Sequence, residues 1–302
     1  MTTPTPVPGA DPGDRFSHRP SQIPGQGEPR NTMDFGMPPV VAPKERSYLE
    51  RQALDLLDFV GSVSLLLARS VRVLFQRPFE TREIIQQLDA IGVKSTGLVI
   101  ISGTFVGMVM ALQFALGLQK FGGMEYTGRV ISLSFTRELA PALTAVIVGG
   151  RIGGGIAAEI GSMAVTEQVD AIRSLGADPV KKLVMPRLVA SVIVIPCVSM
   201  LSLVLGFCGA MFIAQAQFDL PAGFFLSSAL DSVTYPDFWN GFLKTPVFGA
   251  IISLVGCHFG LTTTGGTQGV GRATTNAVVA TTISLLIADF LLTNIFATII
   301  PK

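Results

Sequence analysis

The sequence is poor in charge and in the residues that build catalytic or metal sites. Only 14% of its 302 residues are charged, only 2 are histidine, and the net charge is +1. The three cysteines, Cys197, Cys208 and Cys257, lie in apolar runs without CxxC or histidine spacing, so we expect small helix-packing residues. The composition therefore predicts no nucleic-acid surface, no metal site and no cofactor.

A nucleotide-binding loop is also missing from the sequence. The P-loop pattern GxxxxGKS or GxxxxGKT occurs nowhere, and the glycine-rich stretch Gly149–Gly155 follows an apolar helix instead of a strand. We interpret Gly266–Gly271 in the same way, as a flexible cytoplasmic turn. The chain is thus expected to hydrolyse no ATP and to have no catalytic residues of its own.

What the chain does have is long apolar stretches, and 49% of its residues are hydrophobic. Crossing a hydrocarbon core of ~30 Å takes roughly 20 apolar residues in a helix. The sequence predicts an all-α polytopic membrane protein with an N-terminal interfacial helix and five transmembrane helices. The five predicted spans are Ser95–Leu118, Thr127–Arg151, Leu183–Ile213, Asn240–Thr263 and Ala277–Ile300.

Two segments precede these spans. Residues 1–44 are rich in proline and glycine, which predicts a disordered cytoplasmic tail, and with no basic stretch followed by an apolar core we expect no cleavable signal peptide. Residues 45–92 are expected to form interfacial amphipathic helices, broken at Pro78 and resumed over Phe79–Ile91. Because Phe59–Leu67 is quite apolar, a true first span remains the alternative for the first of these helices.

Basic residues predict the orientation of the chain. Lysines and arginines are dense before the first predicted span and in the connection between the second and third, whereas Gln215–Asp237 is acidic. The positive-inside rule then predicts a cytoplasmic N-terminus and a C-terminus on the opposite side. The polar segment Ala164–Pro179 would be a cytoplasmic amphipathic helix, whose presence between two spans indicates a soluble partner.

Small and charged residues occur within the predicted spans. Gly103 and Gly107 are four residues apart, as are Gly149 and Gly153, a spacing that lets helix backbones approach closely. Ionisable groups in a membrane need a role, and four stand in these spans: Arg137, Glu138, Arg151 and Asp289. They either pair between helices or face a polar cavity, and the cavity role fits Glu138 best. His258 is interpreted as a packing residue.

In this order and spacing, a set of short motifs between Pro78 and the C-terminus resembles the MlaE/YrbE family of permeases, the membrane subunits of MCE-type ABC lipid transporters. The motifs are Gly107-Met108-Val109 with Leu112-Gln113, Arg137-Glu138-Leu139-Ala140-Pro141, Gly150-Arg151, Ala158-Glu159-Ile160-Gly161-Ser162-Met163, Thr166-Glu167-Gln168, Asp178-Pro179, Pro186-Arg187 and Arg272-Ala273-Thr274-Thr275. Residues 93–302 would be the permease domain of that family.

The resemblance implies a homodimer in the bacterial inner membrane that binds an ABC ATPase on the cytoplasmic side and a ring of MCE-domain proteins on the periplasmic side, and it allows for a STAS-domain subunit. The coupling helix would be Val165–Ala177, which would contact the ATPase through Thr166, Glu167, Gln168, Asp170 and Arg173. Lipid would lie between the protomers against Met110, Leu118, Phe121 and Glu138. Gly117 replaces a bulky family residue, so the cavity outline differs.

Two other classes of protein remain as alternatives. An intramembrane lipid-modifying enzyme would need a nucleophile or base cluster in a wet pocket, and no such arrangement of serine, histidine and aspartate is visible. An ion-coupled secondary transporter would use charges within its spans, and Asp289 keeps that alternative open. A P-loop ATPase that co-purifies with the chain would separate the ABC reading from both.

Overall fold

The structure is a computed structural model that describes residues 48–74 and 81–299. The chain divides into two units, Met1–Glu50 and Arg51–Lys302, and the first is described only at Tyr48–Glu50. The tail predicted over 1–44 and the break predicted at Pro78 lie outside the described residues. The second unit holds the elements that bear on function.

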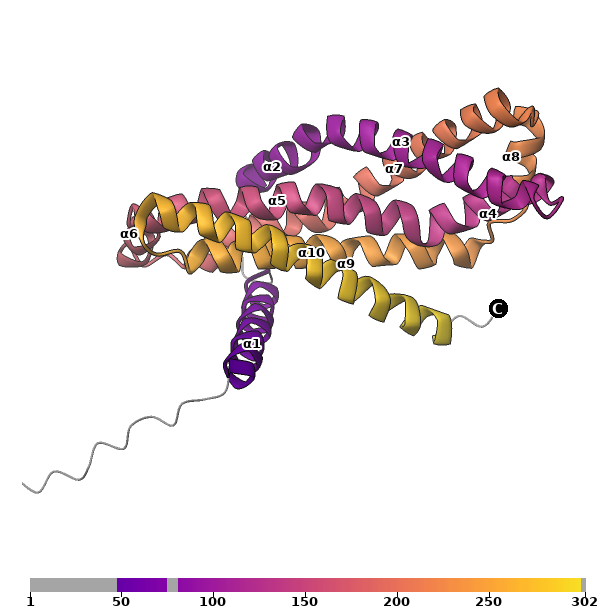
Figure 1. The fold of residues 1–302 in the computed structure, drawn as a ribbon. Helices are drawn as coiled ribbons and strands as arrows, with labels where there is room; N and C mark the ends of the chain where they lie inside the picture. Colours follow the sequence, from indigo (N-terminus) through magenta and orange to yellow (C-terminus); the bar gives the residue numbers. More distant parts are fainter. Residues whose placement is uncertain (1–47, 75–80, 300–302) are drawn as a thin grey trace, which may run out of the picture. The chain divides into compact units, whose positions relative to one another are not determined.

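All regular elements of the described ranges are helical, and five helical segments there are long and apolar enough to cross a membrane (Figure 1). The prediction of an all-α polytopic membrane protein is confirmed. The helices are α1 (Tyr48–Leu74), α2 (Thr81–Leu88), α3 (Lys94–Gln119), α4 (Thr127–Ser134), α5 (Ala140–Val165), α6 (Gln168–Ser174), α7 (Met185–Phe218), α8 (Ala222–Leu230), α9 (Tyr235–Leu261) and α10 (Gly266–Ile299).

Short π-helical turns join several of these helices into longer ones. Asp89–Val93 connects α2 to α3, Phe135–Leu139 connects α4 to α5, and Val180–Val184 leads into α7. The short helix predicted over Phe79–Ile91, leading into the membrane, corresponds in the described residues to α2, which continues through the turn Asp89–Val93 into the first span. The end predicted for the second span at Arg151 is wrong, since the small and apolar residues that follow carry α5 on to Val165.

Two predicted loops are partly helical. The segment Gln215–Asp237 contains the end of α7, all of α8 and the start of α9. The flexible turn predicted at Gly266–Gly271 is wrong, because these residues form the first turns of α10. The turn itself is made just before, where Gly265 has a φ of +86°, a left-handed conformation that glycine adopts without steric cost.

The inner helices of the bundle are α5, α7 and α9. About half of the most apolar stretch is buried in the three spans that contain them (56%, 50% and 56%), against 28% in the span that contains α3 and 11% in α10. The most extensive packing partner of α3 is α7, whereas α10 packs on α5 and α9. The two least covered spans therefore lie on different inner helices.

Glycine contacts bring the helices close together, as the four-residue spacing predicts. A Cβ on Gly107 of α3 would overlap the carbonyl oxygen of Gly206 on α7, and a Cβ on Gly153 of α5 would lie 2.8 Å from Thr281 Oγ1 on α10. Without a hydrophobic drive between helices in lipid, such backbone proximity provides the dispersion contacts that hold the bundle.

Helix α1 is amphipathic and is not one of the five segments apolar enough to span. Ser70 and Val73 are buried, whereas Leu57 and Leu65 are more than 60% exposed. This pattern agrees with a helix that lies at an interface, one side packed and the other open.

Candidate functional site

Pro141 in the second span leaves a backbone carbonyl available for a polar site inside the bundle. Pro141 lacks an N–H, so the carbonyl of Arg137, four residues earlier, has no helical donor at that position. The π-helical turn Phe135–Leu139 precedes it and contains both Arg137 and Glu138. Turns of this kind often occur at functional sites, because the extra residue redirects side chains.

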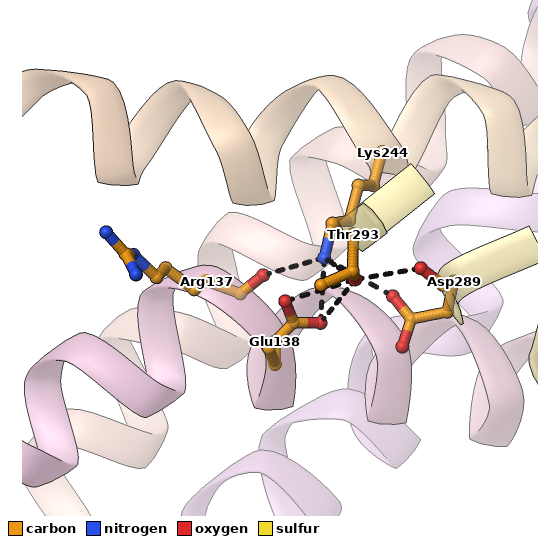
Figure 2. Close-up of polar contacts among 5 residues, drawn as sticks. All are labelled: Arg137, Glu138, Lys244, Asp289 and Thr293. Atoms are coloured by element: carbon orange, nitrogen blue, oxygen red, sulfur yellow. Dashed lines mark hydrogen bonds and ion pairs between the residues drawn. The ribbon is translucent and has the colours of Figure 1, made fainter. Parts of the chain in front are cut away.

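The partner of this turn is Lys244 of α9, whose side chain is fully buried. Its Nζ donates to Glu138 Oε2 at 2.7 Å and to the free carbonyl of Arg137 at 3.3 Å (Figure 2). It also donates to Thr293 Oγ1 of α10 at 2.7 Å, and Asp289 Oδ1 lies 3.5 Å away. A buried ammonium is tolerated only with such partners, so these residues form one charged cluster that ties three helices together.

The charged cluster, defined as Glu138, Lys244, Asp289 and Thr293, is closed on one side and open on the other. The side chain of Lys244 is 0% exposed and that of Asp289 is 22% exposed, whereas that of Glu138 is 37% exposed. Two carboxylates face one ammonium, so the site carries a net negative charge when all three are ionised. The most exposed charged group of the cluster is therefore an acidic one, Glu138.

Arg137 points to a second pairing at the start of α9. Its Nε donates to Asp237 Oδ1 at 2.7 Å, and an Nη forms an ion pair with the same oxygen. The other oxygen of Asp237 accepts from the backbone N–H of Thr234 at 2.9 Å and closes a capping box. Arg137 thus holds the N-terminal end of α9 through Asp237, while Glu138 holds the middle of α9 through Lys244.

At the other end of the bundle, α6 connects α5 to α7 (Figure 1). The coupling helix predicted over Val165–Ala177 is shorter than expected, because α5 ends at Val165 and Glu167 is in the left-handed region with φ +61°. Only Val169 of α6 is buried. The five residues predicted to contact an ATPase, Thr166, Glu167, Gln168, Asp170 and Arg173, are all exposed.

The polar contacts of this segment are local. Asp170 and Arg173 form an ion pair at 2.8 Å with both side chains more than 60% exposed, and Gln168 Nε2 donates to Thr166 Oγ1 at 3.1 Å. Below the segment, buried Arg187 of α7 pairs with Glu159 of α5 at 2.8 Å and closes the base of the connection. An exposed polar surface on a firmly held base can bind a partner without loss of the fold.

Comparison with known proteins identifies the chain. The family model described as Permease MlaE matches residues 84–295. The chain belongs to the MlaE permease family. It is 41% identical over 219 residues to a probable ABC transporter permease protein of Synechocystis, an alignment that covers 72% of this chain and 83% of that protein.

Two further relatives extend the comparison. A probable ABC transporter permease protein of Rickettsia conorii is 39% identical over 246 residues, which covers 82% of this chain and 95% of the relative. The chloroplastic protein TRIGALACTOSYLDIACYLGLYCEROL 1 of Arabidopsis thaliana is 37% identical over 235 residues, with 78% and 67% covered. The chain is thus a permease subunit of an ABC transporter, which implies an ATPase partner.

The four residues predicted to contact substrate lie in two parts of this permease. Met110 and Leu118 are half-buried on α3, and Phe121 in the turn that follows is 87% exposed. Glu138 instead contacts α9 and α10 through the charged cluster. Because α3 packs chiefly on α7, one protomer does not gather all four around a single pocket.

Sequence reasoning missed the residue at the centre of this permease's charged cluster. Lys244 stands alone between the apolar stretches of α9, and a lone lysine within a predicted span is itself a signal. The pairing of Asp237 with Arg137 was missed too, because the two residues are 100 positions apart.

The other charged residues of the spans pair between helices. Asp289 lies 3.5 Å from Lys244, and Arg151 donates to Ser95 Oγ on α3 at 2.6 Å, so both take the structural alternative. His258 packs its ring against Phe59 and Phe259 as expected. Of the three cysteines predicted to pack, Cys257 is buried, but Cys197 and Cys208 are exposed on α7, so the prediction is wrong for these two.

Proposed function

We propose that this permease moves a lipid, a phospholipid or a related hydrophobic molecule, between the inner membrane and the outer envelope of a bacterium. The observation that carries the proposal is the charged cluster, in which the carboxylate of Glu138 is the most exposed charged group, between helices with long apolar faces. A diacyl lipid needs both elements, an apolar wall for its chains and a polar group near its head. One relative supports the substrate class, since the name of the Arabidopsis thaliana protein contains trigalactosyldiacylglycerol, a lipid.

The lipid would lie between two copies of the chain. The open faces of α3 and α10 carry exposed apolar side chains that can form the dimer interface. Two of them are Phe105 (62% exposed) on α3 and Phe290 (68% exposed) on α10. In a twofold dimer the same patches meet twice, so α3 of one protomer can face α10 of the other. Met110, Leu118 and Phe121 would then contact acyl chains on the side where Glu138 is accessible.

ATP hydrolysis would reach this cavity through α6. Thr166, Glu167, Gln168, Asp170 and Arg173 would dock in a groove of the ATPase on the cytoplasmic side. The ion pair between buried Arg187 and exposed Glu159 would pass the movement to α5 and α7, because it joins these helices directly below α6. A periplasmic ring of MCE-domain proteins would receive or deliver the lipid at the opposite end. A STAS-domain subunit would bind on the cytoplasmic side together with the ATPase.

The domain organisation follows from the same proposal. Residues 1–44 would be a cytoplasmic tail, residues 45–92 would be interfacial, and residues 93–302 would form the permease domain. The continuous helix from α2 into α3 would make the interfacial part a direct extension of the first span.

One experiment tests the central claim. The complex is purified from its native membrane by a tag on this chain, and both the subunits and the bound lipids are identified by mass spectrometry. We expect a P-loop ATPase, an MCE-domain protein and enriched lipid. Purification of an active ion-driven transporter without an ATPase would contradict the proposal.

Orientation is tested separately by cysteine labelling. Ser227 on α8 and Ser174 on α6 are both exposed and lie at opposite ends of the bundle. In intact spheroplasts, Ser227→Cys should react with an impermeant maleimide and Ser174→Cys should not. The reverse pattern would invert the proposed topology.

A further inference from the structure

Arg151 of α5 is a charged residue of the second span that does not belong to the charged cluster. Its side chain is exposed and donates to the buried Ser95 Oγ of α3 at 2.6 Å. Within the described ranges no carboxylate pairs with it. A guanidinium has several N–H donors, so the bond to Ser95 leaves others free for a ligand. A cation placed in a span without a countercharge is costly, which makes Arg151 a candidate binding residue.

Two observations place Arg151 toward the cytoplasmic side of the membrane in the proposed orientation. Its partner Ser95 stands at the start of the first predicted span, next to the exposed Lys94. Glu138 of the charged cluster lies thirteen positions before Arg151, which corresponds to roughly 20 Å of helix at 1.5 Å per residue. Arg151 and Glu138 thus stand at different depths of the bundle.

A narrow groove between α3 and α5 leads away from Arg151. Ser102 and Val106 of α3 line one wall, and Leu143 and Ile147 of α5 line the other. Arg151 follows Ile147 by four residues and therefore lies on the same face of α5, one helical turn further on. The apolar wall of the groove thus ends in a guanidinium.

The groove has the length of one acyl chain. Leu139 lines its far end and lies twelve positions before Arg151, which corresponds to roughly 18 Å of helix. One leaflet of the hydrocarbon core is about 15 Å thick. A phospholipid of the inner leaflet has its phosphate at the cytoplasmic boundary and its chains toward the bilayer centre. With the phosphate beside Arg151, a chain would therefore lie along Ile147 and Leu143.

The groove is open beside the guanidinium and continuous with the proposed lipid cavity. A Cβ on Gly155, one turn beyond Arg151, would meet no atom within 4 Å, so a head group has room there. On α3, Met110 follows Val106 by four residues and shares its face. The wall that the proposed function gives to acyl chains therefore extends down to Arg151.

The surrounding charges favour an anionic ligand. Glu159, two turns beyond Arg151 on α5, is paired with Arg187 at 2.8 Å. Asp89, in the turn before α3, is matched in number by the nearby Lys94. Arg151 thus remains as the cation without a countercharge. A guanidinium binds phosphate oxygens in bidentate geometry, which makes a phosphate group the ligand of choice.

We propose that Arg151 binds the phosphate group of a phospholipid of the inner leaflet, with one acyl chain in the groove between α3 and α5. This site would be the cytoplasmic stage of the lipid path, at a different depth from Glu138. The proposal rests on the proposed function, because it takes the space between the protomers as that path. It adds that the substrate carries a phosphate and names the residue that holds it.

The test uses the purified transporter complex, without ATP, in nanodiscs of digalactosyldiacylglycerol, a lipid that contains no phosphate. Each sample contains a trace of photoactivatable lipid with a diazirine on one acyl chain, either phosphatidylglycerol or monogalactosyldiacylglycerol. After illumination, mass spectrometry maps the adducts. We expect phosphatidylglycerol adducts to concentrate on residues 98–106 and 139–151, with about tenfold fewer from the glycolipid, a ratio that corresponds to about 1.4 kcal/mol.

Three variants and one matched control sharpen the test. Arg151→Gln keeps a donor for Ser95 but removes the cation, and should lower the phosphatidylglycerol adducts to the level of the glycolipid. Arg151→Lys keeps the charge without the planar fork and should retain part of the preference. Ile147→Trp fills the groove and should remove the adducts of both lipids. Arg82→Gln removes an exposed arginine of α2 and should change nothing.

Three outcomes would overturn the proposal. Equal labelling by the two lipids would mean that the groove does not recognise phosphate. Unchanged labelling of Arg151→Gln would mean that the guanidinium does not hold it. Loss of the adducts in excess inorganic phosphate would assign the site to a free anion instead of a lipid.

Labelling requires no transport, so this inference and the proposed function can be separated. A complex that is labelled at this site but moves no lipid would contradict only the proposed function. A complex that moves lipid without this labelling would contradict only the site at Arg151.

Discussion

The permease uses the same residue types in opposite ways at its two polar regions. In the charged cluster, Lys244 of α9 is fully buried and bonded to groups from two other helical segments, the turn Phe135–Leu139 and α10. On α6, Asp170 and Arg173 form an ion pair that is local to one helix turn and open to solvent. A buried charge cannot lose a partner cheaply, whereas an exposed pair contributes little to stability. The first region therefore determines the fold around the site, and the second is free to serve binding.

The largest expected effect is at Lys244. Lys244→Met leaves the partly exposed carboxylates of Glu138 and Asp289 without their cation, at a cost of about 3 kcal/mol, the lower end of the range for a broken buried pair. We expect a marked fall in the thermal unfolding midpoint of the detergent-purified permease. The triple variant that adds Glu138→Gln and Asp289→Asn should recover much of the loss. A Lys244→Met protein as stable as the parent would remove the distinction between the two regions.

Charge reversal on α6 should act on binding instead. Glu167→Lys and Asp170→Lys place cations where a docked partner would meet acceptors, and like-charge juxtaposition at an interface costs on the order of several kcal/mol. The unfolding midpoint should stay within error of the parent, while co-purification of the ATPase is lost. Retention of a full, active complex by both variants would show that α6 does not transmit the coupling.

A charge added to the proposed cavity should have an intermediate effect. Met110→Arg and Leu118→Arg each put a guanidinium at an apolar site in the membrane, at a cost of at least ~2.5 kcal/mol. Lipid transfer by reconstituted complexes should fail although the ATPase still binds. Glu138→Gln should be milder than Glu138→Arg, because arginine adds a second cation beside Lys244. Wild-type transfer by both cavity variants would place the lipid elsewhere.

The smallest effect concerns the backbone of Glu167. A non-glycine residue in the left-handed region is strained by roughly 1–2 kcal/mol, and glycine removes this strain but adds about 0.5–1 kcal/mol of unfolded-state entropy. Glu167→Gly should therefore change the unfolding free energy by less than about 1 kcal/mol. Glu167→Val keeps the strain with a stiffer side chain and should be less stable. Equal loss in both variants would mean that the side chain of Glu167 is structural.

Much of the fold could be predicted from the sequence because its signals are local. The five spans could be predicted from the apolar runs. A close helix contact of α3, which the structure makes with α7, could be predicted from the four-residue spacing of Gly103 and Gly107. Span ends were less predictable: α5 continues past Arg151 because nothing in the next residues stops a helix, whatever the depth of the membrane. The start of α10 was misjudged because its glycines read as a turn, although Gly269 packs too closely on Thr264 for any side chain.

Only the acidic residues of the charged cluster could be predicted from the sequence. Glu138 and Asp289 could be recognised as costly in a membrane, but their common partner Lys244 is set by tertiary packing and lies 106 positions from Glu138. The accessible side of the cluster could not be predicted at all, since exposure depends on how α9 and α10 cover Glu138. Local pattern thus locates candidate charges, and only the packing assigns their partners.

The π-helical turn Phe135–Leu139 makes the second span sensitive to the number of its residues. Each residue in an α-helix rotates the next by about 100°. The π-helical turn holds one residue more than a regular turn, and within it Arg137 faces Asp237 while Glu138 faces Lys244. Deleting one residue from this turn would restore a regular helix and remove one of these two directions. The turn can therefore tolerate conservative substitutions, but not insertions or deletions. The geometry of the charged cluster depends on the length of this segment as well as on its residues.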